Sequence, residues 1–260
     1  MWYNIMPHFY CHPENITNQK EFKLSPEESR HAAKVLRKIE GDEISLFDGK
    51  GNSFRGKITS TAGVVSGVIV SSADDKSPSS RPPVKLCFYQ AVPKKYKFED
   101  IIDKLSQLGV SKIIPVITER TIVRLSADDA SRKLVRWRAA ALAASKQCGR
   151  PDIPEVLPPA QFADALSAAA ASGFPAIIAW EAEKQNAKKT IREVLSPSPA
   201  GLNIFIGPEG GFSVREIELA FAILASAKTI GLGPRILRAD TAAEAVAAIL
   251  GYEISVDDPR

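Results

Sequence analysis

The sequence has few cysteines and histidines and no long apolar segment. Its 260 residues include three cysteines, Cys11, Cys87 and Cys148, which are odd in number and widely spaced. That pattern excludes a disulfide framework and favours a reducing compartment. No apolar run approaches the roughly 18 residues that a membrane-spanning helix needs, and the first residues show neither the basic nor the apolar region of a secretory signal. We therefore expect a cytoplasmic globular protein that spans no membrane.

The scarce metal-ligating side chains also argue against a metal centre. His8, Cys11 and His12 lie close in sequence, but no second pair of ligands completes a site. Cys148 has no histidine near it in sequence to act as a base, so we interpret it as a packed helix residue and not as a nucleophile. We expect no metal and no cysteine chemistry.

The net charge of +4 is distributed unevenly along the chain. Residues 81–160 hold fifteen basic and eight acidic side chains, whereas residues 1–80 balance and residues 161–260 are slightly acidic. The basic surplus is densest between residues 112 and 150, where six of the cations are arginines, a side chain that binds phosphate through a two-pronged fork. By itself such a run is as compatible with a solvated helix face as with a polyanion-binding surface.

A polar segment at residues 73–83, rich in proline and serine, predicts a linker between two domains. Before it, the sequence predicts strands at 43–47, 53–59 and 64–70, with a turn-rich connection at 48–52. Ser25-Pro26 predicts the start of a short helix. Residues 1–72 are thus expected to form a small β-rich domain.

After the linker, the hydrophobic pattern alternates between strand and helix. The expected strands are 85–91, 112–117, 175–180, 202–206 and 228–232. The expected helices are 98–108, 127–147, 186–195, one that begins at Ser213, and 240–249. This alternation predicts an α/β domain over residues 84–257 with a parallel sheet covered on both faces.

Two loops that contain glycine and proline follow successive strands of this pattern. The first, residues 207–213, reads GPEGGFS, and the second, residues 231–238, reads GLGPRILR. Ligands of open parallel sheets bind at the carboxyl ends of the strands, and glycine lets the backbone approach a ligand closely. Ser213 and Glu216 form a capping-box pattern that opens the next helix. The absence of GxGxxG and of a Lys-Ser/Thr pair disfavours a nucleoside triphosphate site, and a tight turn that needs glycine is the simpler alternative.

Together the two loops resemble those of the ribosomal RNA small-subunit methyltransferase E (RsmE) family, in the SPOUT class. The resemblance covers nearly the whole chain. Residues 6–10, 31, 35–37, 41–42 and 46–49 are similar to the beginning and the PUA-like RNA-binding domain of that family. Residues 94–95, 104, 119–120, 136–137 and 147–150 are similar to its catalytic domain. The sequence differs from the family pattern at Asp240, Ala143 and His8, which stand where glutamate, glutamate and arginine are usual.

The resemblance implies a homodimeric enzyme that transfers a methyl group from S-adenosylmethionine to N3 of one uridine in 16S ribosomal RNA of the small subunit. It also implies that the C-terminal segment of the α/β domain threads a trefoil knot, an exception to the rule of unknotted chains. The residues that this resemblance assigns to the cofactor pocket are Trp180, Glu181, Ile206, Gly207, Gly210, Gly211, Leu232, Gly233, Ile236, Leu237, Arg238 and Ala242.

Attack on a sulfonium donor depends on in-line placement more than on strong acid–base help. The anion left when uracil loses its N3 proton spreads onto O2 and O4, and we expect Arg238 or Arg120 to stabilise it.

Residues expected to contact RNA are Arg37, Lys94, Lys95, Arg120, Arg124, Arg136 and Arg150. Two alternatives remain: a SPOUT enzyme that acts on another RNA atom, such as a ribose 2′-hydroxyl, and a non-catalytic RNA-binding factor in ribosome assembly.

Overall fold

The computed structural model describes residues 7–72, 84–94, 97–123, 125–183 and 187–256. The chain divides into two compact units. The first comprises the described part of Met1–Arg81 together with Ser145–Ile153, and the second comprises the described part of Pro82–Ala144 and Pro154–Arg260. The expected linker at 73–83 lies outside the described residues. Nothing in the sequence pattern indicates that residues 145–153 join the first unit.

The first unit is a six-stranded sheet with one short helix. Its strands are ordered β1-β4-β5-β6-β3-β2, with β1 parallel to β4 and the other pairs antiparallel. Their bounds are β1 His8–Tyr10, β2 Ile16–Thr17, β3 Glu21–Lys23, β4 Glu43–Phe47, β5 Ser53–Ser60 and β6 Ser66–Ser72. Helix α1 (Pro26–Arg30) begins at the N-cap Ser25, whose side chain accepts from the N–H of Glu28, and continues into a π-helical turn at His31–Val35. The β-rich domain predicted from the sequence is confirmed, although β1, β2 and β3 are too short to show an alternating pattern.

The second unit is built on a parallel sheet whose main path is β10-β8-β7-β12-β11-β13, with β9 paired to β8. Its strands are β7 Lys85–Ala91, β8 Lys112–Ile117, β9 Glu155–Val156, β10 Ala160–Gln161, β11 Ala176–Ala179, β12 Gly201–Ile206 and β13 Ala227–Ile230. Its helices are α2 Phe98–Gln107, α3 Ala127–Cys148, α4 Phe162–Ser172, α5 Ala187–Leu195, α6 Val214–Ile223 and α7 Ala239–Val256, and the last four residues of α3 belong to the first unit.

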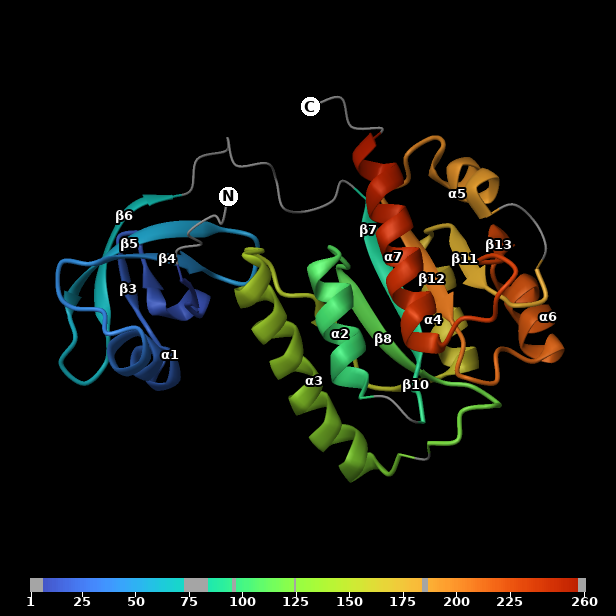
Figure 1. Ribbon diagram of the computed structural model, residues 1–260, viewed down its shortest axis with the longest axis horizontal. Coiled ribbons are helices and arrows are strands. Elements are labelled where there is room, and N and C mark those ends of the chain that lie inside the picture. Colours follow the sequence, from blue (N-terminus) through green and yellow to red (C-terminus); the bar gives the residue numbers. More distant parts are fainter. Residues whose placement is uncertain (1–6, 73–83, 95–96, 124, 184–186, 257–260) are drawn as a thin grey trace. The chain divides into compact units, whose positions relative to one another are not determined.

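Helices cover both faces of this sheet, as the sequence predicts (Figure 1). On one face α4 and α6 pack together over a buried cluster that includes Phe162, Phe205 and Ile217. Because successive side chains of a strand point to opposite faces, Ile204 and Phe88, both fully buried, face the other side. That side is covered by α2 and α7, which contact each other. The sheet is therefore held rigid from both sides, and its strand ends form a stable platform.

Candidate functional site

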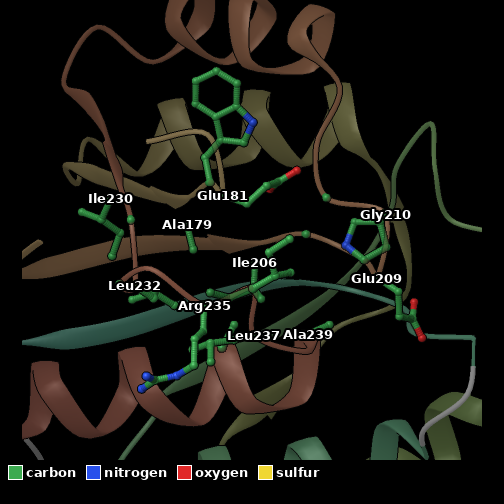
Figure 2. Close-up of a pocket in the computed structure, with 18 of the residues that line it drawn as sticks. Ala179, Glu181, Ile206, Glu209, Gly210, Ile230, Leu232, Arg235, Leu237 and Ala239 are labelled. Atoms are coloured by element: carbon green, nitrogen blue, oxygen red, sulfur yellow. The ribbon is translucent and has the colours of Figure 1, made fainter. Parts of the chain in front are cut away.

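The carboxyl ends of β11, β12 and β13 meet at one edge of the parallel sheet. β11 lies between the other two strands, and Ala179 is level with Ile206 on one side and with Ile230 on the other. The loops that leave these three ends surround a pocket of about 300 Å³ (Figure 2). The lining residues are Ala179, Trp180, Glu181, Ile206, Gly207, Pro208, Glu209, Gly210, Gly211, Ile230, Gly231, Leu232, Gly233, Pro234, Arg235, Ile236, Leu237, Ala239 and Ala242.

The glycine-rich loop after β12 forms one wall of the pocket. The N–H of Gly211 donates to the carbonyl of Pro208 at 2.9 Å, which closes a tight turn. Gly211 has φ +68°, a backbone conformation that favours glycine. A Cβ atom at this position would also collide with the Glu181 carboxylate, which extends from the end of β11 towards this loop (Figure 2). The loop ends in the predicted capping box, in which Ser213 and Glu216 bond each other's backbone N–H.

The loop after β13 forms the opposite wall. Gly231 lies so close to the carbonyl of Glu183 that a Cβ atom would not fit, and Thr229 Oγ1 donates to Glu183 Oε2 at 2.5 Å. The loop therefore packs directly against the segment that follows β11. It then enters α7, whose first-turn residues Ala239 and Ala242 line the pocket with small side chains.

Two neighbouring strand ends hold the glycine-rich loop from outside. After β7, the N–H of Lys94 donates to Glu209 Oε1 at 2.9 Å. After β8, Arg120 Nη1 donates to the carbonyl oxygen of Gly210 at 2.6 Å. The pocket wall is thus tied to the centre of the sheet, and the guanidinium of Arg120 is brought beside a lining residue 90 positions away in sequence.

The lining combines apolar side chains, several glycines and the charged residues Glu181, Glu209 and Arg235. Apolar surfaces accommodate a flat aromatic ring, backbone groups bond its edge, and a carboxylate accepts hydrogen bonds from hydroxyl or ammonium groups. This composition suits a nucleoside-like ligand of modest size.

Comparison with known proteins identifies the family. The RNA methyltransferase domain family matches residues 80–251, and the RNA methyltransferase PUA domain family matches residues 24–63. The chain belongs to the ribosomal RNA small subunit methyltransferase E family. A relative of that name from Bacillus subtilis is 28% identical over 92% of this chain and 93% of its own. One from Mesomycoplasma hyopneumoniae is 34% identical over 64% and 68%, respectively.

A solved structure of the same family resembles the fold of this chain. The crystal structure of a ribosomal RNA small subunit methyltransferase E from Neisseria gonorrhoeae, bound to S-adenosyl methionine, superposes with a TM-score of 0.80. It is 29% identical and covers 95% of this chain and 98% of its own. The resemblance inferred from the sequence and the α/β fold with a PUA domain are confirmed. The threading of the C-terminal knot stays a prediction.

The structure of this small subunit methyltransferase E family member gathers the predicted cofactor residues in one place. Eleven of the twelve line the pocket, and Arg238 does not. Their binding of a cofactor remains a prediction. Sequence reasoning did not select eight lining residues, although six of them adjoin selected residues in the two loops. The eight are Ala179, Pro208, Glu209, Ile230, Gly231, Pro234, Arg235 and Ala239.

The two candidate catalytic arginines occupy different positions. Arg120 contacts the pocket wall through Gly210, as described above. Arg238 precedes α7, where its Nη2 lies 3.1 Å from Asp240 Oδ2. Both arginines are exposed to solvent.

The predicted RNA-contacting residues also differ in their surroundings. Arg37 and Lys94 are exposed, and Arg37 has φ +53°. Arg136 is exposed but pairs with Glu99 at 2.9 Å. Arg150 is only 5% exposed and donates to both carboxylate oxygens of Asp152, at 3.1 and 2.7 Å. An internal ion pair thus occupies the guanidinium of Arg150, and its contact with RNA stays a prediction. Lys95 and Arg124 lie outside the described residues.

The thiols and the other metal-ligating side chains form no second centre within the described ranges. Burial raises the pKa of the Cys11 thiol to about 11 and also raises the pKa of Cys87, so neither is a ready nucleophile. Cys148 lies at the end of α3 and is exposed, so the interpretation of it as a packed residue is wrong. No group of three or more His, Cys, Asp or Glu in the described part of the chain could hold a metal ion. No described helix is long and apolar enough to cross a membrane.

Proposed function

We propose that this protein transfers the methyl group of S-adenosylmethionine to N3 of a specific uridine in 16S ribosomal RNA of the small subunit. The observation that carries the proposal is the pocket at the ends of β11, β12 and β13, lined by the two motif loops of the family. A relative named ribosomal RNA small subunit methyltransferase E was crystallised bound to the same cofactor, which supports the choice of ligand.

The pocket residues fit an adenosyl cofactor. Gly207, Gly210 and Gly211 leave the space that side chains would otherwise fill, and Ile206 and Leu237 offer apolar surface to an adenine ring. The Glu181 carboxylate, aimed towards the glycine-rich loop, accepts hydrogen bonds from hydroxyl or ammonium groups. Bound there, S-adenosylmethionine supplies an electrophilic methyl group on a positively charged sulfur.

The protein's part in the reaction is to hold the uracil in line and to stabilise the charge that it develops. Loss of the weakly acidic N3 proton leaves negative charge on N3, O2 and O4. A guanidinium aimed at those oxygens stabilises the transition state more than the neutral base. Arg120 and Arg238 are the candidates for this task, because one contacts the glycine-rich loop and the other precedes α7.

N3 lies on the Watson–Crick edge of uracil, so the target base must be unpaired or flipped out. Exposed cations such as Arg37, Lys94 and Arg136 are proposed to hold the surrounding phosphates.

We also propose that the protein acts as a homodimer with the small ribosomal subunit as its partner. Since ribosomal RNA is the proposed substrate, the proposal includes a cytoplasmic location.

The test is to incubate the purified protein with S-adenosylmethionine and small subunits that lack the modification, then map methylated nucleosides by mass spectrometry. A single N3-methyluridine in 16S RNA is the expected product. Methylation of a ribose or of another base atom would show that N3 of uracil is not the atom that receives the methyl group. Cofactor binding without any methylation would favour the non-catalytic assembly factor.

Alanine variants assign the two arginines. Only one of the two arginines is expected to stabilise the charge on uracil. Its alanine variant, Arg120→Ala or Arg238→Ala, is expected to lower kcat by about a hundredfold with little change in RNA affinity, because the interaction strengthens only in the transition state. Arg215→Ala is the matched control, since Arg215 is an exposed arginine on α6 that does not line the pocket. Equal losses of turnover and RNA affinity would indicate a phosphate contact instead.

A further inference from the structure

The turn that carries Arg120 is stabilised by its own hydrogen bonds. The N–H of Thr118 donates to Thr121 Oγ1 at 3.0 Å, and the N–H of Thr121 donates to the carbonyl of Thr118 at 3.1 Å. The two threonine hydroxyls lie 2.8 Å apart. This turn follows β8 directly, so Glu119 and Arg120 project from a fixed strand end and not from a long loop.

Glu119 docks this turn onto the start of α6. Its N–H donates to Glu216 Oε1 at 2.8 Å, and its Oε2 accepts a hydrogen bond of 2.7 Å from Ser213 Oγ. Ser213 Oγ also accepts from the N–H of Glu216 at 3.2 Å, so its one proton and a lone pair are both used. Glu216 is only 7% exposed, and its second oxygen accepts from the N–H of Ser213 at 2.9 Å. A capping box requires only the bonds between Ser213 and Glu216, so the two bonds to Glu119 are additional.

The neighbouring residue, Arg120, lies along the glycine-rich loop. Its Nη1 donates to the carbonyl of Gly210, and its Cβ and Cδ atoms would each be 3.4 Å from a Cβ built on Gly210. Within the described residues, its Nε and Nη2 groups have no hydrogen-bond partner. Arg120 thus uses one donor to fix its position and keeps the others for a ligand that carries negative charge.

We propose that Glu119 is a positioning residue, which holds Arg120 against the glycine-rich loop by clamping the turn 118–121 to Ser213 and Glu216. The guanidinium of Arg120 is then oriented before the substrate arrives, and no free energy is spent on ordering it during the reaction. This inference rests on the proposed function, in which Arg120 is a candidate for stabilising the charge on uracil. Glu119 itself acts only through Arg120.

A double-mutant cycle tests this coupling. Glu119→Ala is expected to lower kcat about tenfold while KM for RNA and the Kd of S-adenosylmethionine stay unchanged, because only the orientation of a transition-state contact is lost. Arg120→Ala is expected to cost more, and the double variant is expected to match Arg120→Ala. Multiplying losses in the double variant would overturn the proposal.

Two further variants separate positioning from a general structural effect. Glu119→Gln retains an oxygen that can accept from Ser213 and should restore most of kcat. Glu218→Ala is the control, since Glu218 is an exposed glutamate on α6, the helix that Ser213 caps, and takes no part in the network. A loss of kcat in Glu218→Ala equal to that in Glu119→Ala, or no rescue by Glu119→Gln, would contradict a specific role for Glu119.

A crystal structure of Glu119→Ala tests the clamp whatever the RNA substrate proves to be. The expected result is a displaced turn 118–121 in which Arg120 no longer contacts the carbonyl of Gly210. An unchanged contact would overturn the clamp. Failure of the proposed function is distinct, because it would show as an absence of methylation by the unmodified protein.

Discussion

At the scale of single residues, two glycines of the second unit illustrate different requirements. Gly211 combines a positive φ with a Cα that faces the Glu181 carboxylate, so both its backbone and its missing side chain matter. Gly251, in α7, has neither feature, because outside its own helix backbone no described atom lies within 4 Å of a Cβ built there, and its φ is not positive. A glycine count alone does not distinguish them.

We predict that Gly211→Ala weakens S-adenosylmethionine binding at least about tenfold and destabilises the fold by about 1–2 kcal/mol, because an alanine at positive φ is strained and its methyl group displaces Glu181. Isothermal titration and urea unfolding measure the two effects. Gly251→Ala is the matched control and should raise stability by up to about 1 kcal/mol, since alanine favours a helix interior. An unchanged Kd of S-adenosylmethionine in Gly211→Ala would show that the glycine-rich loop does not take part in cofactor binding.

At the scale of elements, β1 is a three-residue strand that pairs with β4 and whose first residue, His8, also contacts β4 through its side chain. His8 Nδ1 lies 3.0 Å from Ser45 Oγ, and the imidazole stacks on Phe47 with 4.5 Å between ring centroids. Its Nε2 is buried and has no hydrogen-bond partner among the described residues. Burial lowers the pKa of His8 from 6.5 to about 4. His8 is therefore uncharged in the folded protein at neutral pH.

This shift predicts a pH-dependent stability of the first unit. Below pH 6.5 the unfolded chain binds a proton at His8, whereas the folded chain binds it only near pH 4. The free energy of unfolding should therefore fall as the pH is lowered from 6.5 to 4, with a slope of at most about 1.4 kcal/mol per pH unit from this one proton. Urea unfolding of His8→Phe and of the unmodified protein checks it. The two curves should run parallel above pH 7 and diverge below, and parallel curves down to pH 4 would contradict the assignment.

At the scale of the whole molecule, several arginines of the basic segment 81–160 form ion pairs with carboxylates, which leaves less positive charge available to bind phosphate. Arg132 pairs with Asp129, Arg136 with Glu99, and Arg150 with Asp152. Arg37, outside that region, is exposed, and no ion pair for it occurs in the described residues. The density of arginine in the sequence thus overstates the positive surface available to RNA.

We predict that RNA affinity falls steeply with salt, and that Arg37→Ala weakens it more than Arg136→Ala. Each phosphate contact contributes a slope of about −0.7 to −0.9 in log affinity against log salt concentration. Loss of Arg37 should reduce the magnitude of the total slope by about one contact, whereas Glu99 already offsets the charge of Arg136. Filter binding at several salt concentrations measures both variants, and an affinity that ignores salt would refute a phosphate-based interface.

The sequence by itself determined most of the elements and the loops that line the pocket, but not the short strands β1, β2, β3, β9 and β10 or helix α4. Strand and helix periodicity, the capping box at Ser213 and the glycine-rich segments are local signals, and the parallel sheet brings the ends of successive strands to one edge. Tertiary structure alone decided the contact of Arg120 with Gly210, the docking of Glu119 on Ser213, the burial of Arg150 and the inclusion of residues 145–153 in the first unit. Each of these depends on which distant groups the sheet order and the packing bring within hydrogen-bond distance, and no periodicity in the chain records that proximity.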